Sequence, residues 1–335
     1  MCVIVIMLMD ALALQVAERS VLMPINVNIV HSSHLDLYWS GEQAECLKRG
    51  AVIIDDAISR CLSDPKFHFM IETVRFVEYY LYHFPHRQGD LKKTVARGQI
   101  EIAACYTDRY ETMHDGESLI RNVVYGKRML RDLLGVESRF ATHPDLPAQA
   151  PQIPQIYSMA GLDYYLYARL FHDGLRHRWQ ALDESHIITY NFPLHYGYYS
   201  FEDDLIPSIP AIQKATHTDD TILISCSAGD LGPCDAFIQP TKPGEQREYI
   251  CLSGLIKDLN EKYPELHFQF ANGCKTLDAL DHSQLPVLTG ETPSAKAPLL
   301  RRPMCCCISL TKTYRVISKK PRSIPASARC SACRL

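Results

Sequence analysis

The clearest periodic segment of the chain spans residues 117–134, where apolar side chains recur at three- and four-residue steps. These positions are Leu119, Ile120, Val123, Val124, Met129, Leu130, Leu133 and Leu134. That spacing places them on one face of a helix. Gly135 follows, and glycine readily adopts the left-handed backbone conformation that closes many helices. The pattern therefore predicts an amphipathic helix over 117–134.

Shorter apolar runs alternate with helical patterns along most of the chain. Strands are predicted at 25–30, 67–71, 100–105, 138–142, 164–168, 187–190 and 221–226, and further helices at 40–63, 73–83, 89–98, 149–160, 246–261 and 275–281. Ser40 is the expected start of the helix over 40–63. Strands that alternate with helices at this spacing are typical of a parallel sheet with helical crossovers. The sequence therefore predicts an α/β fold, with the sheet either open or closed as a barrel.

Polar and ionisable residues stand directly after most of the predicted strands. In chain order they are His34 and Asp36, Glu72, Tyr106 and Asp108, His143 and Asp145, Arg169, and Asp230. In open α/β sheets and in β/α barrels alike, ligands bind beyond the carboxyl ends of the strands. One polar loop residue is unremarkable, whereas histidines and carboxylates after successive strands indicate a site.

The first of these groups has the chemistry of a metal site. An apolar run through Val27, Ile29 and Val30 leads into His34 and Asp36. The last two are two positions apart, so an extended backbone points both side chains to the same face. Imidazole nitrogen and carboxylate oxygen suit zinc or a similar divalent ion. The same pair is also common as ordinary hydrogen-bonded structure, so both interpretations stay open at this point.

Composition and charge indicate a soluble globular protein without a nucleic-acid or membrane partner. A chain of 335 residues with 47% hydrophobic and 22% charged residues is ordinary for a soluble globular protein. The formal net charge of -3 favours neither a nucleic-acid partner nor an anionic membrane surface. Every charged residue in 301–335 is basic, so the net charge of residues 1–300 is more negative than that of the whole chain. An acidic protein surface is compatible with a neutral substrate and a bound cation. No apolar stretch approaches the roughly 20 residues that a membrane-spanning helix needs.

Cysteine usage and the amino terminus bear on location. The 13 cysteines are odd in number, and the one pair with metal or redox spacing is Cys330 and Cys333. A reduced, cytoplasmic chain is therefore expected. The apolar start has no basic residue before it, although Ala11-Leu12-Ala13 resembles a signal-peptide cleavage site. Secretion remains the alternative.

Four segments together resemble the N-terminal catalytic domain of glycoside hydrolase family 38, the class II α-mannosidases and their relatives. They are His34-Leu35-Asp36-Leu37-Tyr38-Trp39, Gly116-Glu117-Ser118-Leu119-Ile120-Arg121, His143-Pro144-Asp145 with Gln152-Ile153-Pro154-Gln155-Ile156, and Leu285-Pro286-Val287-Leu288-Thr289-Gly290-Glu291. The family's patterns here are His-x-Asp-x-x-Trp, Gly-Glu-Ser-x-x-Arg, the segment of its essential aspartate, and Leu-Pro-Val-x-x-Gly-Glu. The likeness runs in the right order through residues 25–292.

The resemblance implies a seven-stranded β/α barrel with one divalent metal ion, usually zinc. Its protein ligands would be His34, Asp36 and Asp145, and Asp145 would also be the catalytic nucleophile. Asp230, in a glycine-rich turn, would be the acid/base. Glu72 and Glu117 are the reserves for that role, and Glu117 has helix capping as its alternative.

Further residues are implied as contacts for the sugar. They are Trp39, Arg169, Glu72, His195 and Tyr196. Arg169 would also orient Asp145, with a salt bridge at the barrel rim as the alternative. Core packing is the alternative for Trp39, and a solvent-facing loop is the alternative for His195 and Tyr196.

The domain organisation leaves three functions open. Residues 1–24 are predicted to be an N-terminal extension, 25–292 the catalytic domain, and 293–335 an irregular, basic, cysteine-containing tail. Family catalytic regions continue into a helical domain that supplies a fourth metal ligand, for which this sequence offers no candidate. The chain is therefore expected to be a retaining, metal-dependent α-mannosidase acting on mannosides of glycans or glycosides. The alternatives are a truncated inactive relative, or a metal-dependent carbohydrate deacetylase on a related barrel. Oligomeric state is left open.

Overall fold

The computed structural model describes residues 24–146, 149–169, 175–197, 199–238 and 249–291. The predicted tail over 293–335 and nearly all of the predicted N-terminal extension lie outside these ranges. Within them, no helix combines the length and the apolar character needed to cross a membrane.

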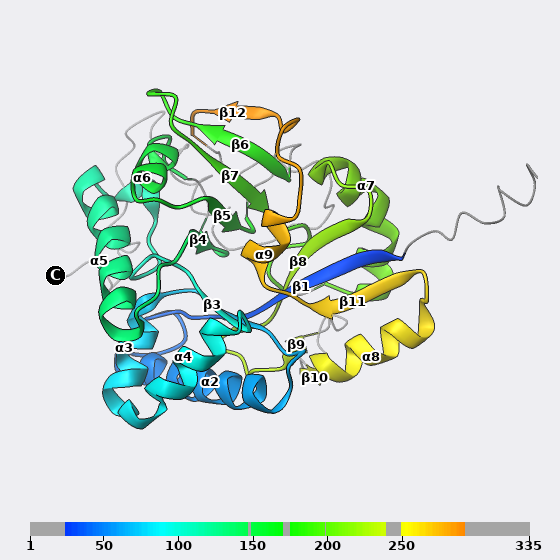
Figure 1. The fold of residues 1–335 in the computed structure, drawn as a ribbon, viewed down its shortest axis with the longest axis horizontal. Helices are drawn as coiled ribbons and strands as arrows, with labels where there is room; N and C mark the ends of the chain where they lie inside the picture. The colour runs from blue at the N-terminus through cyan, green and yellow to red at the C-terminus, as the bar shows by residue number, and fades with distance from the viewer. Residues whose placement is uncertain (1–23, 147–148, 170–174, 198, 239–248, 292–335) are drawn as a thin grey trace, which may run out of the picture. The chain divides into compact units, whose positions relative to one another are not determined.

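One parallel sheet is built around the first strand. β1 (Ile25–His34) pairs with β8 (Thr221–Asp230) along nearly its whole length. β11 (Leu266–Phe270) and β2 (Phe69–Ile71) share the opposite edge of β1, and β3 (Ile100–Ile102) pairs with β2. Figure 1 shows β1, in dark blue, between β8 and β11. The carboxyl ends of these strands therefore meet at one edge.

A second sheet contains an antiparallel pair that the sequence did not predict. Its order is β12 (Val287–Thr289), β6 (Arg176–Gln180), β7 (His186–Asn191), β5 (Tyr164–Tyr167) and β4 (Phe140–His143). β6 runs antiparallel to β7, and the other pairs are parallel. β9 (Ala236–Ile238) and β10 (Tyr249–Cys251) form a separate antiparallel ribbon.

Strands of both large sheets surround one shared core, but no closed barrel is found in the described ranges. Val30, Met70, Leu166 and Leu223 are among the side chains that meet there. Between β3 and β4 the backbone link is a single hydrogen bond, in which the Ala104 N–H donates to the Phe140 carbonyl at 2.8 Å. Between β7 and β8 the Tyr190 hydroxyl bonds both the carbonyl and the N–H of Leu223. The predicted α/β fold with parallel strands is confirmed. The predicted closure into a barrel is not confirmed, because among the described residues only these isolated hydrogen bonds, and no continuous strand pairing, join β3 to β4 and β7 to β8.

The helices lie mostly where periodicity placed them. They are α2 (Gln43–Ser63), α3 (Val74–His83), α4 (Gln88–Ala96), α5 (Gly116–Leu134), α6 (Ile153–Met159), α7 (Ile206–Thr216), α8 (Leu252–Lys262) and α9 (Gly273–Asp278), with the short 3-10 helices η1 (Pro85–Arg87) and η2 (Glu111–Met113) and the π-helix η3 (Phe201–Leu205). Gly135 follows α5 as predicted, and its φ is 72°, in the left-handed region. Ser40 was the wrong start for α2, since the residue before the helix is Glu42. Figure 1 shows α2, α3 and α4 gathered together and α8 beside β11.

Gly126 shows how closely α5 packs against the strand layer. A Cβ on this residue would lie 2.0 Å from the Ala104 carbonyl oxygen, far inside van der Waals contact. The Tyr106 N–H also donates to the Asn122 carbonyl at 3.0 Å. α5 therefore fixes the segment that follows β3.

His31 is a structural histidine at the centre of the first sheet. Its Nδ1 lies 2.9 Å from the Cys226 carbonyl oxygen, and its Nε2 accepts the Asp235 N–H at 3.0 Å. Those partners require a neutral ring with the proton on Nδ1. The ring centroids of Phe67 and Phe69 lie 5.9 and 5.3 Å from that of His31. Burial lowers the pKa of His31 to about 4.

We expect His31 to make the fold acid-sensitive. Its pKa is lower in the folded chain than the ordinary 6.5, so the unfolded chain binds the proton more tightly. The stability that this difference provides is present above pH 6.5 and is lost as the pH falls to 4, by about 3 kcal/mol of unfolding free energy. Denaturant unfolding of wild type and His31→Gln across this range measures it, since Gln keeps a donor and an acceptor without titrating. Parallel stability curves for the two proteins would contradict the assignment.

Candidate active site

Three predicted residues converge at the carboxyl ends of β1 and β8. The strand register places His34, the last residue of β1, opposite Asp230, the last residue of β8. Asp36 follows two residues after His34, and its Oδ1 lies 3.3 Å from His34 Nε2. One ligand atom each from His34, Asp36 and Asp230 lie within 4.8 Å of one another. This is a donor set of one imidazole and two carboxylates.

Asp145 lies at the edge of this group. It comes two residues after β4, and its Oδ2 is 3.9 Å from His34 Nε2. Its other oxygen, Oδ1, accepts a hydrogen bond from Arg169 Nε and forms an ion pair with Arg169 Nη2. The sequence predicted a ligand set of His34, Asp36 and Asp145. In the structure Asp230 completes the tight group instead, and Asp145 is drawn toward the guanidinium.

Glu72 lies behind His34. Its Oε2 is 2.9 Å from His34 Nδ1 and accepts the Leu35 N–H at 3.1 Å, while its Oε1 accepts the Ser32 hydroxyl at 3.3 Å. The residue is 2% exposed. These contacts turn His34 Nε2 toward the carboxylates. A carboxylate on the second nitrogen is the usual support of a metal-binding histidine.

The electrostatics of the group favour a cation. Burial alone would lower the pKa of His34, but Glu72 and Asp36 raise it well above its ordinary value. Burial raises the pKa of Asp145, although His34 and Arg169 oppose the rise. Several carboxylates therefore compete for the positive charge of one imidazole and one guanidinium. A divalent ion would supply the charge that this arrangement lacks.

The loop after β7 brings two more predicted residues to the site. The Tyr196 hydroxyl donates to Asp230 Oδ1 at 3.2 Å, and its ring lies 5.2 Å from that of His34. His195 Nε2 is 3.8 Å from Asp145 Oδ1. Burial, with smaller effects from Arg169 and His34, lowers the pKa of His195 to about 3. Because Tyr196 is 3% exposed, the solvent-facing alternative does not describe it.

The remaining sequence candidates lie on the surface. Trp39 is 80% exposed, so the alternative of core packing is wrong, and Tyr38 beside it is 69% exposed. Glu117 forms an exposed ion pair with Arg121 at 2.7 Å. The cap of α5 is Asp115, which accepts the Ser118 N–H at 2.7 Å. Glu117 therefore belongs neither to the cap hydrogen bond nor to the group around His34.

A second buried polar network is centred on His143, the last residue of β4 and two positions before Asp145 in the sequence. His143 bonds Asp108 through Nδ1 and lies 3.0 Å from the Tyr157 hydroxyl through Nε2. The hydroxyls of Tyr157 and Tyr165 donate to Glu111 Oε1 at 3.0 and 3.1 Å. Burial raises the pKa of Glu111 to about 7. The sequence singled out His143 and Asp108 but missed Glu111, which follows no apolar run. The network ties the segment after β3 to the end of β4.

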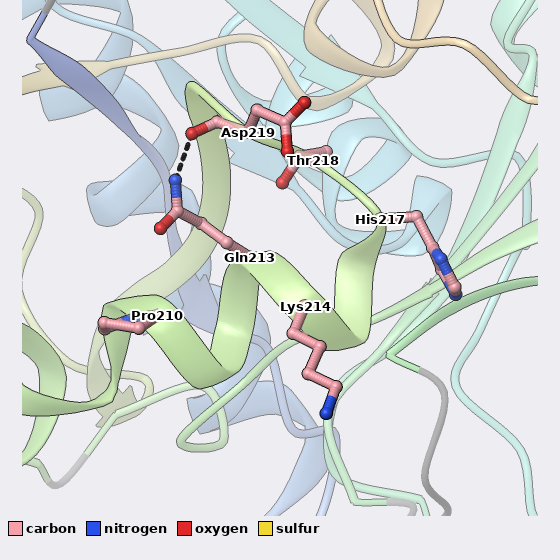
Figure 2. A pocket seen from close by; sticks show the side chains of 6 residues that line it. All are labelled: Pro210, Gln213, Lys214, His217, Thr218 and Asp219. Carbon is pink, nitrogen blue, oxygen red and sulfur yellow. Dashed lines mark hydrogen bonds between the residues drawn. The ribbon is translucent and has the colours of Figure 1, made fainter. Parts of the chain in front are cut away.

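A separate pocket of about 340 Å³ lies at the carboxyl end of α7. It is lined by Pro210, Gln213, Lys214, His217, Thr218 and Asp219. Figure 2 shows the Gln213 side chain donating to the Asp219 backbone carbonyl. None of the predicted site residues lines this pocket, and it lies at a helix end rather than at strand ends. We therefore place the candidate site at His34.

Comparison with known proteins gives the same family as the motifs. The profile of the glycosyl hydrolases family 38 N-terminal domain matches residues 24–230. α-Mannosidase G of Dictyostelium discoideum is 24% identical over 167 residues, 48% of this chain and 15% of that protein. The Saccharomyces cerevisiae α-mannosidase is 22% identical over 179 residues, 50% of this chain and 16% of that protein. The chain thus spans about one sixth of the length of these curated relatives.

A solved structure shares the fold. The crystal structure of an α-mannosidase from Enterococcus faecalis superposes with a TM-score of 0.66 at 21% identity, covering 80% of this chain and 31% of that one. The family profile covers more than half of the chain and includes His34, Asp36, Asp145 and Asp230. This chain belongs to glycoside hydrolase family 38.

Proposed function

We propose that this chain carries the active site of a retaining, metal-dependent α-mannosidase. The observation that carries the proposal is the group of His34, Asp36 and Asp230 with Asp145 at its edge, at the strand ends of a family 38 chain. The relatives named above are α-mannosidases, which supports a mannoside as substrate. Family membership also favours this reaction over carbohydrate deacetylation.

The residues present fit one divalent metal ion, and zinc suits them best. One imidazole nitrogen and carboxylate oxygens are a common zinc donor set, and Glu72 holds His34 in the orientation that such a ligand needs. His34 and Asp36 would hold the ion, with Asp145 as the third ligand that the family resemblance implies. When bound, it would act as a Lewis acid toward sugar hydroxyls and keep the nearby carboxylates ionised.

The two remaining roles divide between Asp145 and Asp230. Arg169 holds Asp145 Oδ1, which leaves Oδ2 to attack the anomeric carbon. Asp230 protonates the departing oxygen and then takes a proton from the water that releases the sugar. Two displacements restore the original configuration, and they require the carboxyl groups to lie about 5–5.5 Å apart.

The test uses the full chain and an aryl α-mannoside. We expect one zinc ion per chain, hydrolysis that a chelator abolishes and zinc restores, and an α-anomer as the first product in a proton NMR time course. A chain that binds no metal and hydrolyses nothing would be the truncated inactive relative. Release of acetate from an acetylated sugar, without mannoside hydrolysis, would select the deacetylase alternative.

A further inference from the structure

The backbone is strained at the point where His195 enters the site. Leu194 and His195 have φ angles of 63° and 71°, in the left-handed region that side chains other than glycine rarely adopt. They are the one adjacent pair of such residues within the described ranges. Strain of this kind persists where the surrounding structure imposes it, and it concentrates at functional sites.

Contacts on both sides hold His195 in this conformation. Leu194 packs against the core cluster that includes Val27 and Ile224. Tyr196 is 3% exposed, and its hydroxyl is bonded to Asp230. The turn therefore cannot relax without withdrawing Leu194 from the core or breaking the link to Asp230.

The imidazole faces Asp145. Its ring lies 4.2 Å from that of Tyr196, and its Nε2 lies 3.8 Å from Asp145 Oδ1. Its Nδ1 is buried without a hydrogen-bond partner in the described part of the chain. Asp145 is therefore the group that selects the tautomer, and a carboxylate favours the ring with its proton on Nε2.

We propose that His195 is a positioning residue for the nucleophile, donating its Nε2–H to Asp145 Oδ1 when substrate is bound. The proposal rests on the proposed function above, and it replaces the sugar contact expected from the sequence. The present distance of 3.8 Å is longer than a hydrogen bond. Catalytic hydrogen bonds are often long in ligand-free enzymes and shorten in the substrate complex. Arg169 and His195 would then hold the same oxygen, which leaves Oδ2 as the attacking atom.

Three substitutions separate the imidazole from the strain. His195→Gly removes both, His195→Leu removes the donor and keeps the strain, and His195→Gln keeps the strain and an amide donor near the Nε2 position. On an activated aryl α-mannoside, we expect kcat to fall about 10–100-fold for Gly and Leu and less than about tenfold for Gln. KM should change little, because the lost interaction is with Asp145 and not with the sugar. Added imidazole should restore part of kcat in the Gly variant and none in the Leu variant.

Stability provides a second readout. His195→Gly should raise Tm by about 2–4 °C while activity falls, because it relieves the left-handed strain. The matched control is His217→Gly, since His217 is exposed, has a φ of 53° and ends α7. It should raise Tm similarly and leave kcat unchanged.

Each result assigns a role to His195. Wild-type activity in His195→Gly would overturn the inference, as would a raised KM with unchanged kcat, which would assign His195 to the sugar. A wild-type chain without mannosidase activity would overturn the proposed function and this inference with it. Activity in wild type that falls in His195→Gly and returns with imidazole would support both.

Discussion

Asp145→Asn is expected to lower kcat on an activated aryl α-mannoside by at least about 10⁴-fold. An amide oxygen is too weak a nucleophile to attack the anomeric carbon. It also carries no charge, so the contacts to Arg169 and His34 lose their electrostatic basis. Steady-state kinetics at saturating metal measure the loss, with Tm as the check that the variant is folded.

Added azide distinguishes a lost nucleophile from a damaged site. In the shorter variant Asp145→Ala, the small anion can occupy the space of the missing carboxylate and attack the sugar from the same side as Asp145. The product should then be the β-mannosyl azide, with the configuration inverted. Undiminished hydrolysis by Asp145→Asn would remove the glycosidase interpretation altogether.

The elements that the sequence predicted are those whose apolar spacing agrees with their burial. In α5 the predicted apolar positions Leu119, Val123 and Leu130 are buried, and Gly135 follows the helix as glycine's backbone freedom allows. Ile120 and Val124, predicted on the same face, are 44% and 54% exposed. β1 was predicted over 25–30 but continues to His34. Its last four residues are polar and buried, and apolar spacing does not mark them, because each side chain has a polar partner inside the fold.

β6 and α7 are among the elements that the sequence did not predict, because polar residues and prolines obscure their patterns. β6 contains Arg176, which is 1% exposed. Its Nε donates to the Thr216 carbonyl at 2.7 Å and its Nη2 to the His217 carbonyl at 2.9 Å. The guanidinium thus supplies donors to the last carbonyl groups of α7, and these hydrogen bonds offset the cost of burying Arg176. α7 carries Pro210 inside the helix, and a proline there argues against a helix when the sequence is read alone.

The site could be located from the sequence, but its internal contacts could not be. Residues after successive strands were expected to meet, and His34, Asp36, Asp145 and Asp230 do meet. His34 lies opposite Asp230 because β1 pairs with β8, and nearly two hundred positions separate these two residues in the sequence. The local pattern of residues does not predict so distant a pairing. Glu72 was expected to contact sugar, whereas its burial behind His34 appears only once β1 and β2 are paired.

Asp230→Asn should have an effect that depends on the leaving group. An acid is needed when the departing oxygen is a poor leaving group, so kcat/KM on an unactivated mannoside should fall about 10²–10⁴-fold. An aryl group that leaves as a stable anion needs no proton, so the loss there should be much smaller. Paired kinetics on the two substrates measure the contrast, and Asp145→Asn is the matched control because it should be equally damaging on both.

The same experiment decides whether Asp230 is the acid/base or a metal ligand. The structure groups Asp230 with His34 and Asp36 more tightly than Asp145, which a metal ligand would also do. A ligand lost by substitution should lower metal content and reduce activity on both substrates alike. An acid lost by substitution should leave metal content unchanged and spare the activated substrate. Equal losses on both substrates, accompanied by loss of metal, would therefore move Asp230 into the ligand set and leave the acid/base role to be assigned to another carboxyl group.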